Sequence, residues 1–380
     1  MQIHNYEPKV IYQETNPYGS LTAFLEDDGR TVYMYLQSEH NPEWTMKSVW
    51  IKNRIQAPTK MSMDDAKDGL APILSSEYVE QSDEAQITPE GIYFIWTEEG
   101  DGVALFVKEE LYAFIPPWSG IGGFHGYSKF VQKEALTAFP LGDSNHGVIS
   151  DRVNEARKFW EFRANKDSWK MIQGNLLHFL ESKFGSHTKY WSADGGKFPY
   201  IGIAKFLPVS YPDVIIYSTI GISGQNMPQV ELYHRDRYLD YARVELVIAI
   251  RTKENQGNTE KWIPHLIGEI VHFPWKMLQW YGNGHTVSMS RKDPEGLLEF
   301  TTLLLLDNPP SITQENQQME IPVLTELRSK EGRPIHFLFA LPITEEEKLF
   351  IQENGLQKFT ELWVEKGNDW IHNSQRTSIV

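Results

Sequence analysis

Metal binding is the first chemistry that the sequence could support. His265, Glu269 and His272 stand at spacings of four and seven residues, so a helix would place them near one face, where imidazole and carboxylate groups can bind zinc. The residues between them are mostly aliphatic, which is the pattern of an amphipathic helix with a solvated polar side. The chain has no cysteine, which excludes a thiolate site. We therefore predict no metal site.

Two other stretches are similar to catalytic motifs but leave them incomplete. The sequence GISGQ at 221–225 lacks the final glycine of a nucleophile elbow, so we interpret Ser223 as part of a turn after a strand. Gly195, Gly196 and Lys197 would suit a phosphate-binding loop, but Phe198 follows them and offers no hydroxyl to a metal. The sequence therefore predicts no catalytic residue and no cofactor.

Single histidines and clustered carboxylates are the remaining candidates for acid–base chemistry. His125 and His285 each lie among glycines, and neither has a sequence-adjacent partner, so we interpret both as loop or interface residues rather than general bases. Glu98, Glu99 and Asp101 occupy a glycine-containing turn. We interpret these three carboxylates as solvated turn residues.

Charge is distributed unevenly along the 380 residues. The whole chain has 36 basic and 51 acidic residues, a net charge of −15. Residues 1–150 contain 10 basic and 22 acidic residues, so this part alone has a net charge of −12. Such a field repels nucleic acid and anionic lipid and attracts basic proteins, although it also serves solubility. No apolar run is long enough to span a membrane, and the first ten residues lack the features of a signal peptide. We therefore expect a cytoplasmic protein.

Residues 1–150 have the pattern of an acidic, β-rich domain. Apolar segments 21–25 and 31–36 flank one glycine-containing turn, and segments 91–97 and 103–107 flank another, so two hairpins are predicted. Segment 111–115 adds a third strand to the second hairpin. Between the hairpins, residues 61–86 form an acidic loop.

Residues 151–380 alternate helical and strand patterns, as expected of an α+β domain that follows a connection at 142–150. Thr344 and Glu347 form a capping box that starts a helix ending at Gly355. A second helix has Asp167 as its predicted N-cap and ends at Gly185. Further helices are predicted at 151–165 and 264–273, and strands at 200–206, 214–219, 244–250, 301–306 and 336–341.

An ordered set of short segments in the second part resembles the suppressor-of-fused family. The set spans about residues 170–365, and residues 98–105 and 116–127 are similar to an accessory domain that precedes this module in some bacterial relatives. The resemblance implies an α+β binding domain, with a mixed sheet and flanking helices, that has no enzymatic activity. The segments are YPDV at 211–214, STIGIS at 218–223, RVELV at 243–247, Trp262 with the following helix, GHTV at 284–287, and 335–347.

The family resemblance also implies a kind of partner. Animal members sequester a transcription factor by gripping an extended peptide, whereas bacterial members resemble immunity proteins that neutralise toxins. We therefore expect a non-enzymatic protein that binds a toxin domain, and the acidic first part favours a basic one. The alternatives are a small-molecule enzyme with a site between the domains that uses His125 or His285, and a general interaction scaffold.

Contact residues for such a partner are predicted from charge and from aromatic side chains. Carboxylates raise association rates, and aromatic rings supply contact area at low entropic cost. The predicted contact residues are Asp64, Asp65, Asp68, Trp118, Phe124, His125, Tyr127 and His285.

Overall fold

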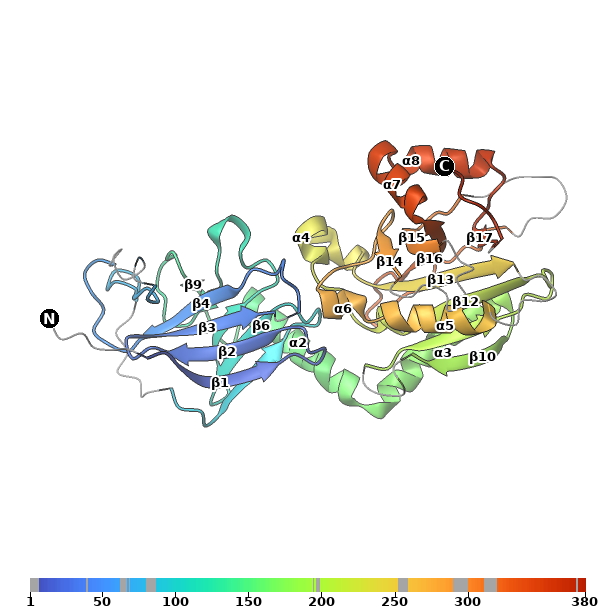
Figure 1. Cartoon of the computed structure of the whole chain (residues 1–380). Coiled ribbons are helices and arrows are strands. Elements are labelled where there is room, and N and C mark those ends of the chain that lie inside the picture. The colour runs from blue at the N-terminus through green and yellow to red at the C-terminus, as the bar shows by residue number, and fades with distance from the viewer. Residues whose placement is uncertain are drawn as a thin grey trace. The chain divides into compact units, whose positions relative to one another are not determined.

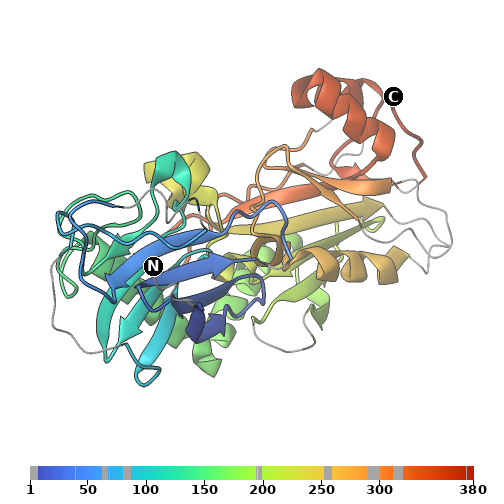
Figure 2. The same ribbon diagram turned by 60° about the vertical axis from the view of Figure 1, so that its left-hand side comes forward.

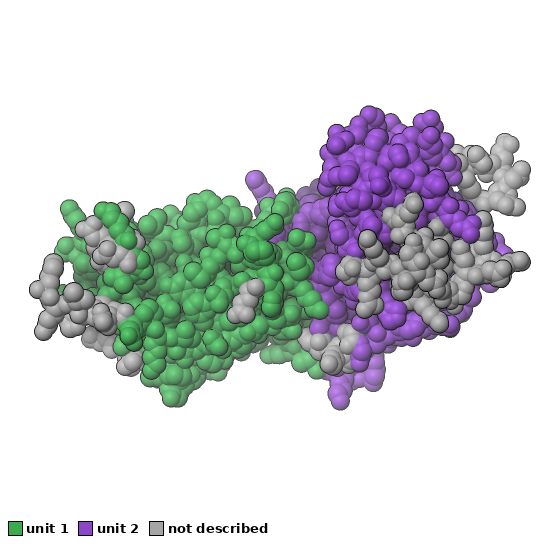
Figure 3. All heavy atoms as spheres, in the orientation of Figure 1, with its two compact units in different colours: residues 1–164, 231–233, 275–279 green, residues 165–230, 234–274, 280–380 purple. Residues whose placement is uncertain are grey.

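Two compact units make up the structure, a computed structural model (Figures 1 and 2). Unit 1 comprises Met1–Ala164, Glu231–Tyr233 and Trp275–Gln279, and unit 2 comprises the remainder (Figure 3). The structure describes residues 7–38, 40–61, 67, 69–79, 87–193, 195, 199–251, 259–289, 300–310, 320–373 and 375–380, with only the backbone for 259–262.

Unit 1 contains two sheets that enclose a common core. One sheet has the order β1-β2-β3-β4 and the other the order β5-β6-β7-β8-β9. Buried side chains from both sheets, such as Leu25, Trp50 and Leu105, form one cluster, so the sheets pack face to face. The strands are β1 Lys9–Thr15, β2 Thr22–Asp27, β3 Thr31–Gln37, β4 Lys47–Asn53, β5 Ile92–Trp96, β6 Val103–Val107, β7 Glu110–Ile115, β8 Tyr127–Ser128 and β9 Phe139–Pro140.

Both predicted hairpins of unit 1 are confirmed. Strand β2 pairs antiparallel with β3, and β5, β6 and β7 form an antiparallel meander. Gly29 and Gly100 have φ values of 80° and 79° in the two predicted turns, where a side chain would be strained. The turn into β7 has left-handed Lys108 and Glu109 instead of glycine, with φ values of 48° and 66°.

Helix α2 (Val148–Ala164) begins inside the stretch where the sequence predicts a connection. It belongs to unit 1, and the next helix, α3 (Lys166–Phe184), belongs to unit 2, so the compact units change at Ala164. The division into domains 1–150 and 151–380 stays a prediction. The N-cap of α3 is Asn165, whose side chain accepts a hydrogen bond from the Asp167 amide. The prediction of Asp167 as the N-cap was therefore wrong by two residues.

Unit 2 is built on a mixed sheet with the order β10-β11-β12-β13-β16-β15-β14, and β17 pairs with β13. The β13 pairings with β16 and β17 are parallel, and the other pairings are antiparallel. This arrangement confirms the predicted α+β class with a mixed sheet. The strands are β10 His187–Ser192, β11 Gly202–Phe206, β12 Val214–Ile220, β13 Val244–Arg251, β14 Thr286–Ser288, β15 Phe300–Leu306, β16 His336–Thr344 and β17 Ile371–His372.

Helices flank the sheet of unit 2. Helix α3 packs on one face through Leu176 and Leu180, and α5 contacts β11 and β12. Helix α5 begins at Thr259, so Pro264 lies inside it and not in its first turn as predicted. Helix α7 contacts β15 and β16. The helices after α3 are α4 Val230–His234, α5 Thr259–Ile270, α6 Phe273–Met277, α7 Glu345–Asn354 and α8 Leu356–Glu365. The chain also has the 3-10 turns η1 Ile121–Gly123 in unit 1, and η2 Ile222–Gly224 and η3 Arg235–Asp240 in unit 2.

Candidate interaction surface

The aromatic loop of unit 1 lies between β7 and β8. Gly120, Gly122 and Gly123 all have positive φ and are exposed. Phe124 folds back against Tyr127 and Phe139, with both ring centroids 5.0 Å from its own. The loop therefore presents half-buried rings next to exposed glycines.

Trp118 contributes to the core of unit 1 as well as to this loop. Its half-buried ring packs edge-on against Phe114 with a centroid distance of 6.4 Å, and the Arg152 guanidinium lies 5.1 Å above it. Arg152 in turn donates to both carboxylate oxygens of Glu231, at 3.0 and 2.7 Å. Truncation of Trp118 would therefore disturb the fold together with any contact that it makes.

His125 fixes the same loop to the other sheet of unit 1. Its Nδ1 lies 3.0 Å from the carbonyl oxygen of Ser48 in β4, and because a carbonyl only accepts, Nδ1 is the donor. The Ser119 hydroxyl donates to the His125 carbonyl. The predicted contact residues Asp64, Asp65 and Asp68 lie outside the described residues.

Two of the three turn carboxylates at 98–101 are buried, so their interpretation as solvated residues was wrong. Glu99 is 6% exposed and Asp101 is 0% exposed. Each has a cation from a distant segment nearby. Arg152 lies 3.9 Å from Glu99. Lys47 interacts with Asp101: burial lowers the pKa of Lys47 to about 8, and the charge of Asp101 opposes that shift. The turn sequence gave no sign of these partners because they come from β4 and α2.

His285 belongs to a row of five aromatic rings in unit 2, which we call the five-ring stack. Its first three rings are stacked, and the other two contacts are edge-on. Successive ring centroids lie 5.8, 4.0, 5.0 and 4.5 Å apart. The rings come from the start of β16, from the ends of α4 and η3, and from the loop after α6. In spatial order the members are His336, Tyr241, His234, Trp280 and His285.

Backbone contacts hold the five-ring stack in place. His285 Nδ1 lies 3.0 Å from the carbonyl oxygen of Trp280, and His336 Nε2 contacts the carbonyl oxygen of Asp240. A Cβ on Gly282 would lie 2.4 Å from a ring carbon of Trp280, so only glycine lets that ring lie over the loop backbone. The loop backbone and its own contacts therefore position the Trp280 and His285 rings.

The five rings of the five-ring stack are half-buried. Burial lowers the pKa of His234, and the nearby Arg237 lowers it further. Arg237 itself is exposed, lies 5.6 Å from the Tyr241 ring centroid and donates to the Tyr241 hydroxyl at 3.3 Å. Aromatic rings and arginine are the residue types enriched in the centres of protein interfaces.

The family-like segments STIGIS and RVELV meet in a buried polar network. Glu245 in β13 is 0% exposed and accepts four hydrogen bonds. The donors are the Thr219 hydroxyl at 2.6 Å, the Gly221 amide at 2.8 Å, and the Ser223 amide and hydroxyl at 3.0 and 2.6 Å. Burial raises the pKa of Glu245, and the hydrogen bonds oppose that shift. Because Ser223 is itself buried and bonded, its contacts agree with the turn interpretation.

The three candidate metal ligands, His265, Glu269 and His272, do not form a metal site in the described part of the chain. His272 lies beyond the end of α5, so the three candidate ligands do not share one helix. No group of three histidine or acidic side chains among the described residues could hold a metal ion. Likewise, none of the helices in that part of the chain has the length and apolar character to cross a bilayer.

A β-sandwich unit and an α+β unit with a mixed sheet thus define the class of the molecule. Residues 199–377 match the family model described as Suppressor of fused protein (SUFU), and the chain therefore carries a domain of the suppressor of fused family. A role in protein interaction is compatible with this family. None of the curated proteins is significantly similar to the chain.

Several solved structures are similar to part of the chain, and three of them illustrate the similarity. A SUFU homolog from Neisseria gonorrhoeae is 17% identical, with 56% of this chain and 98% of that one covered and a TM-score of 0.34. The Sufu–Fu complex is 15% identical, with 56% and 91% covered and a TM-score of 0.36. Drosophila Suppressor of Fused is 12% identical, with 55% and 51% covered and a TM-score of 0.36.

Proposed function

We propose that the chain is a non-enzymatic immunity or antitoxin protein, which binds a toxin domain and blocks it. The five-ring stack is the observation that carries the binding role. It combines rigid aromatic rings with an exposed arginine, and a surface that is ordered in advance loses little entropy on binding. The family domain in the same unit supports a protein partner.

A basic partner is favoured by the charge of the first 150 residues. A net charge of −12 accelerates the approach of a cationic protein, and salt screens that attraction beyond about 8 Å at physiological ionic strength. The carboxylates would therefore act on the association rate, while buried rings would set the lifetime of the complex. The predicted domain boundary near residue 150 and a cytoplasmic location belong to the same proposal.

The absence of catalysis is supported by the contacts of the candidate bases. In the described part of the chain, His125 and His285 each direct Nδ1 to a backbone carbonyl and contact no carboxylate. The Ser223 hydroxyl is fully buried and bonded to Glu245. These are contacts that order loops.

Capture of a partner with matched baits tests the proposal. Wild type and Trp280→Ala serve as baits, with the exposed Met171→Ala as a control that leaves the five-ring stack intact. We expect a toxin domain that wild type and the control retain and that Trp280→Ala releases at least tenfold faster. Asp64→Asn, Asp65→Asn and Asp68→Asn together should slow its association and flatten the salt dependence. A partner bound equally by Trp280→Ala would contradict the role of the stack, and turnover of a small molecule by the pure chain would contradict the proposal itself.

A further inference from the structure

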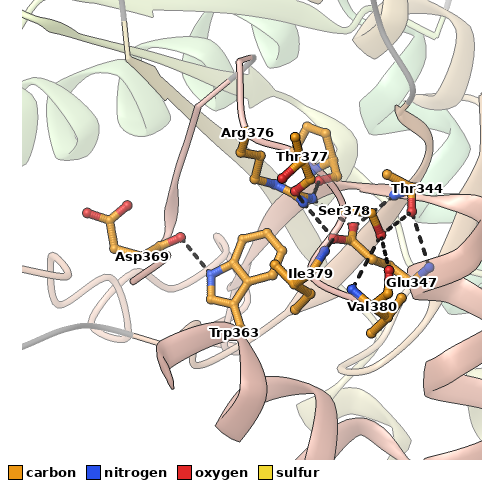
Figure 4. Close-up of polar contacts among 10 residues, drawn as sticks. Thr344, Glu347, Trp363, Asp369, Arg376, Thr377, Ser378, Ile379 and Val380 are labelled. Atoms are coloured by element: carbon orange, nitrogen blue, oxygen red, sulfur yellow. Dashed lines mark hydrogen bonds and ion pairs between the residues drawn. The ribbon is translucent and has the colours of Figure 1, made fainter. Parts of the chain in front are cut away.

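Arg376 lies in a buried site that surrounds its guanidinium group (Figure 4). Nη1 and Nη2 donate to the two carboxylate oxygens of Glu347 at 2.5 and 2.8 Å, and Nη2 also donates to the carbonyl oxygen of Pro342 at 2.8 Å. The side chains of Arg376 and Glu347 are 6% and 0% exposed. The two charges are thus paired with little access to water.

Two aromatic rings complete the site. The guanidinium carbon of Arg376 lies 4.6 Å from the Phe300 ring centroid and 4.4 Å from that of Trp363. Flat cations stack on such rings, and a bidentate carboxylate fits the fork of a guanidinium and not the single ammonium of lysine. The geometry is therefore selective for arginine.

A second contact lies three residues further along. The Ile379 amide donates to Glu347 at 3.0 Å, and its side chain packs against an apolar cluster that includes Leu304 and Phe359. The Ser378 hydroxyl lies 3.4 Å from that of Thr344. An arginine followed three positions later by an aliphatic residue thus meets both an ionic and an apolar subsite.

Side chains, and not a strand ladder, hold this segment. Residues 375–380 belong to no helix or strand, and the Arg376 amide donates to the carbonyl oxygen of Asn373, just before this segment, at 3.1 Å. The exposed side chains of Gln375 and Thr377 alternate with anchored ones. The segment is bound in the way that an extended peptide ligand is bound.

We propose that Glu347, Phe300 and Trp363 form a recognition site for an extended peptide of a partner protein that carries arginine and, three positions later, an aliphatic residue. Residues 376–379 fill this site as an internal ligand. Loss of Arg376 leaves the buried Glu347 without a cation, so the site favours refilling by another guanidinium. Because the internal ligand is tethered at high effective concentration, an outside peptide binds the wild-type chain weakly.

Binding of a labelled peptide with the sequence of residues 373–380 to the full-length Arg376→Ala chain tests the site by fluorescence anisotropy. We expect saturable binding that is at least tenfold weaker to the wild-type chain and at least tenfold weaker when lysine replaces arginine in the peptide. Arg376→Lys, which keeps a cation beside Glu347, is the second variant if Arg376→Ala does not fold. Equal affinity of arginine and lysine peptides, or no binding to either variant, would overturn the proposal.

The wild-type chain gives a test without any substitution. Excess peptide should displace residues 376–379 and accelerate hydrogen exchange of the Ile379 amide, whereas the lysine peptide should not. Unchanged exchange at a peptide concentration that saturates the wild-type chain in the anisotropy titration would overturn the internal-ligand role. The site lies in unit 2 and does not require the acidic residues 1–150, so peptide binding and toxin binding can fail separately.

Discussion

Two buried glutamates in unit 2 differ in the kind of group that donates hydrogen bonds to them. Glu245 and Glu347 are both 0% exposed. Glu245 accepts from hydroxyl and amide groups of the adjoining strand and turn, which carry no charge. Glu347 accepts from the Thr344 amide of its own capping box and from the guanidinium of Arg376, which is 29 residues away in the chain. The donors to Glu245 are part of the sheet and its turn, while the charged donor to Glu347 arrives on a segment outside the sheet.

This difference separates a fixed contact from an exchangeable one. Donors on β12 and η2 cannot leave Glu245 without breaking the sheet, so that network specifies the fold. Arg376 can leave when the segment that carries it detaches, and a guanidinium from elsewhere can take its place. We therefore expect substitutions at the two sites to differ in magnitude and in whether a second change restores stability.

The largest effect is expected from Glu245→Leu. The substitution leaves two amides and two hydroxyls without their acceptor, and each lost acceptor costs about 1–3 kcal/mol. We expect no folded protein by circular dichroism. Glu245→Gln keeps one acceptor oxygen and should fold with a loss of roughly 2 kcal/mol in urea titration. A folded Glu245→Leu chain within 1 kcal/mol of wild type would refute the fixed role of this network.

Arg376→Ala should cost about 3–5 kcal/mol in the free energy of unfolding, because it leaves the charge of Glu347 buried and unpaired. Glu347→Gln in the same chain removes that charge and keeps a capping-box residue, so part of the loss should be recovered. Arg237→Ala, which removes an exposed arginine, is the control and should change stability by less than about 0.5 kcal/mol. Additive losses in the double variant would argue against an unpaired buried charge.

Lowering the pH should destabilise the folded chain through His372, which is buried near Arg376. His372 is 1% exposed, its ring nitrogens have no hydrogen-bond partner among the described residues, and burial together with Arg376 lowers its pKa to about 3. The unfolded chain binds a proton below about pH 6.5 and the folded chain does not, so stability falls as pH drops, by roughly 1.4 kcal/mol per pH unit.

His372→Leu should remove this part of the pH dependence. Between pH 6.5 and 5, we expect urea titration to show a loss about 2 kcal/mol larger for wild type than for the variant. His178→Asn, which alters an exposed histidine, should follow wild type. Parallel curves for wild type and His372→Leu would contradict a neutral, buried His372.

Gly282→Ala should cost about 1–3 kcal/mol, because its Cβ would displace the Trp280 ring of the five-ring stack. Gly174→Ala is the matched control, since its Cβ meets nothing within 4 Å in α3, and it should stabilise by about 0.4–1 kcal/mol. Thermal unfolding measures both changes. Equal stability of the two variants would show that the Trp280 ring is free to move.

Local patterns predicted the elements well and predicted long-range contacts poorly. The capping box of Thr344 and Glu347 is confirmed, with both reciprocal bonds present, because all of its signals lie within four residues. The same Glu347 also binds Arg376, and no local pattern indicates that contact. Glu99 and Asp101 were misinterpreted for the same reason, since their compensating cations lie in other elements.

Of the five-ring stack, the sequence predicts only His285 as a contact residue, because glycines surround it. His234, Tyr241, Trp280 and His336 follow no local pattern, and the fold brings their rings together. The close approach of Gly282 to Trp280 offered a weak local sign, because glycines on both sides of Asn283 indicate tight backbone.

Native-state hydrogen exchange compares the two buried glutamates most directly. The amides of Gly221 and Ser223 donate to Glu245, and the amide of Ile379 donates to Glu347. If Arg376 and Ile379 form an exchangeable internal ligand, the Ile379 amide exchanges through local opening, at least 100-fold faster than the other two, with little dependence on denaturant. The Gly221 and Ser223 amides then exchange only through global unfolding. Equal protection of all three amides, with the same denaturant dependence, would show that residues 376–379 are as fixed as the sheet and would contradict the account.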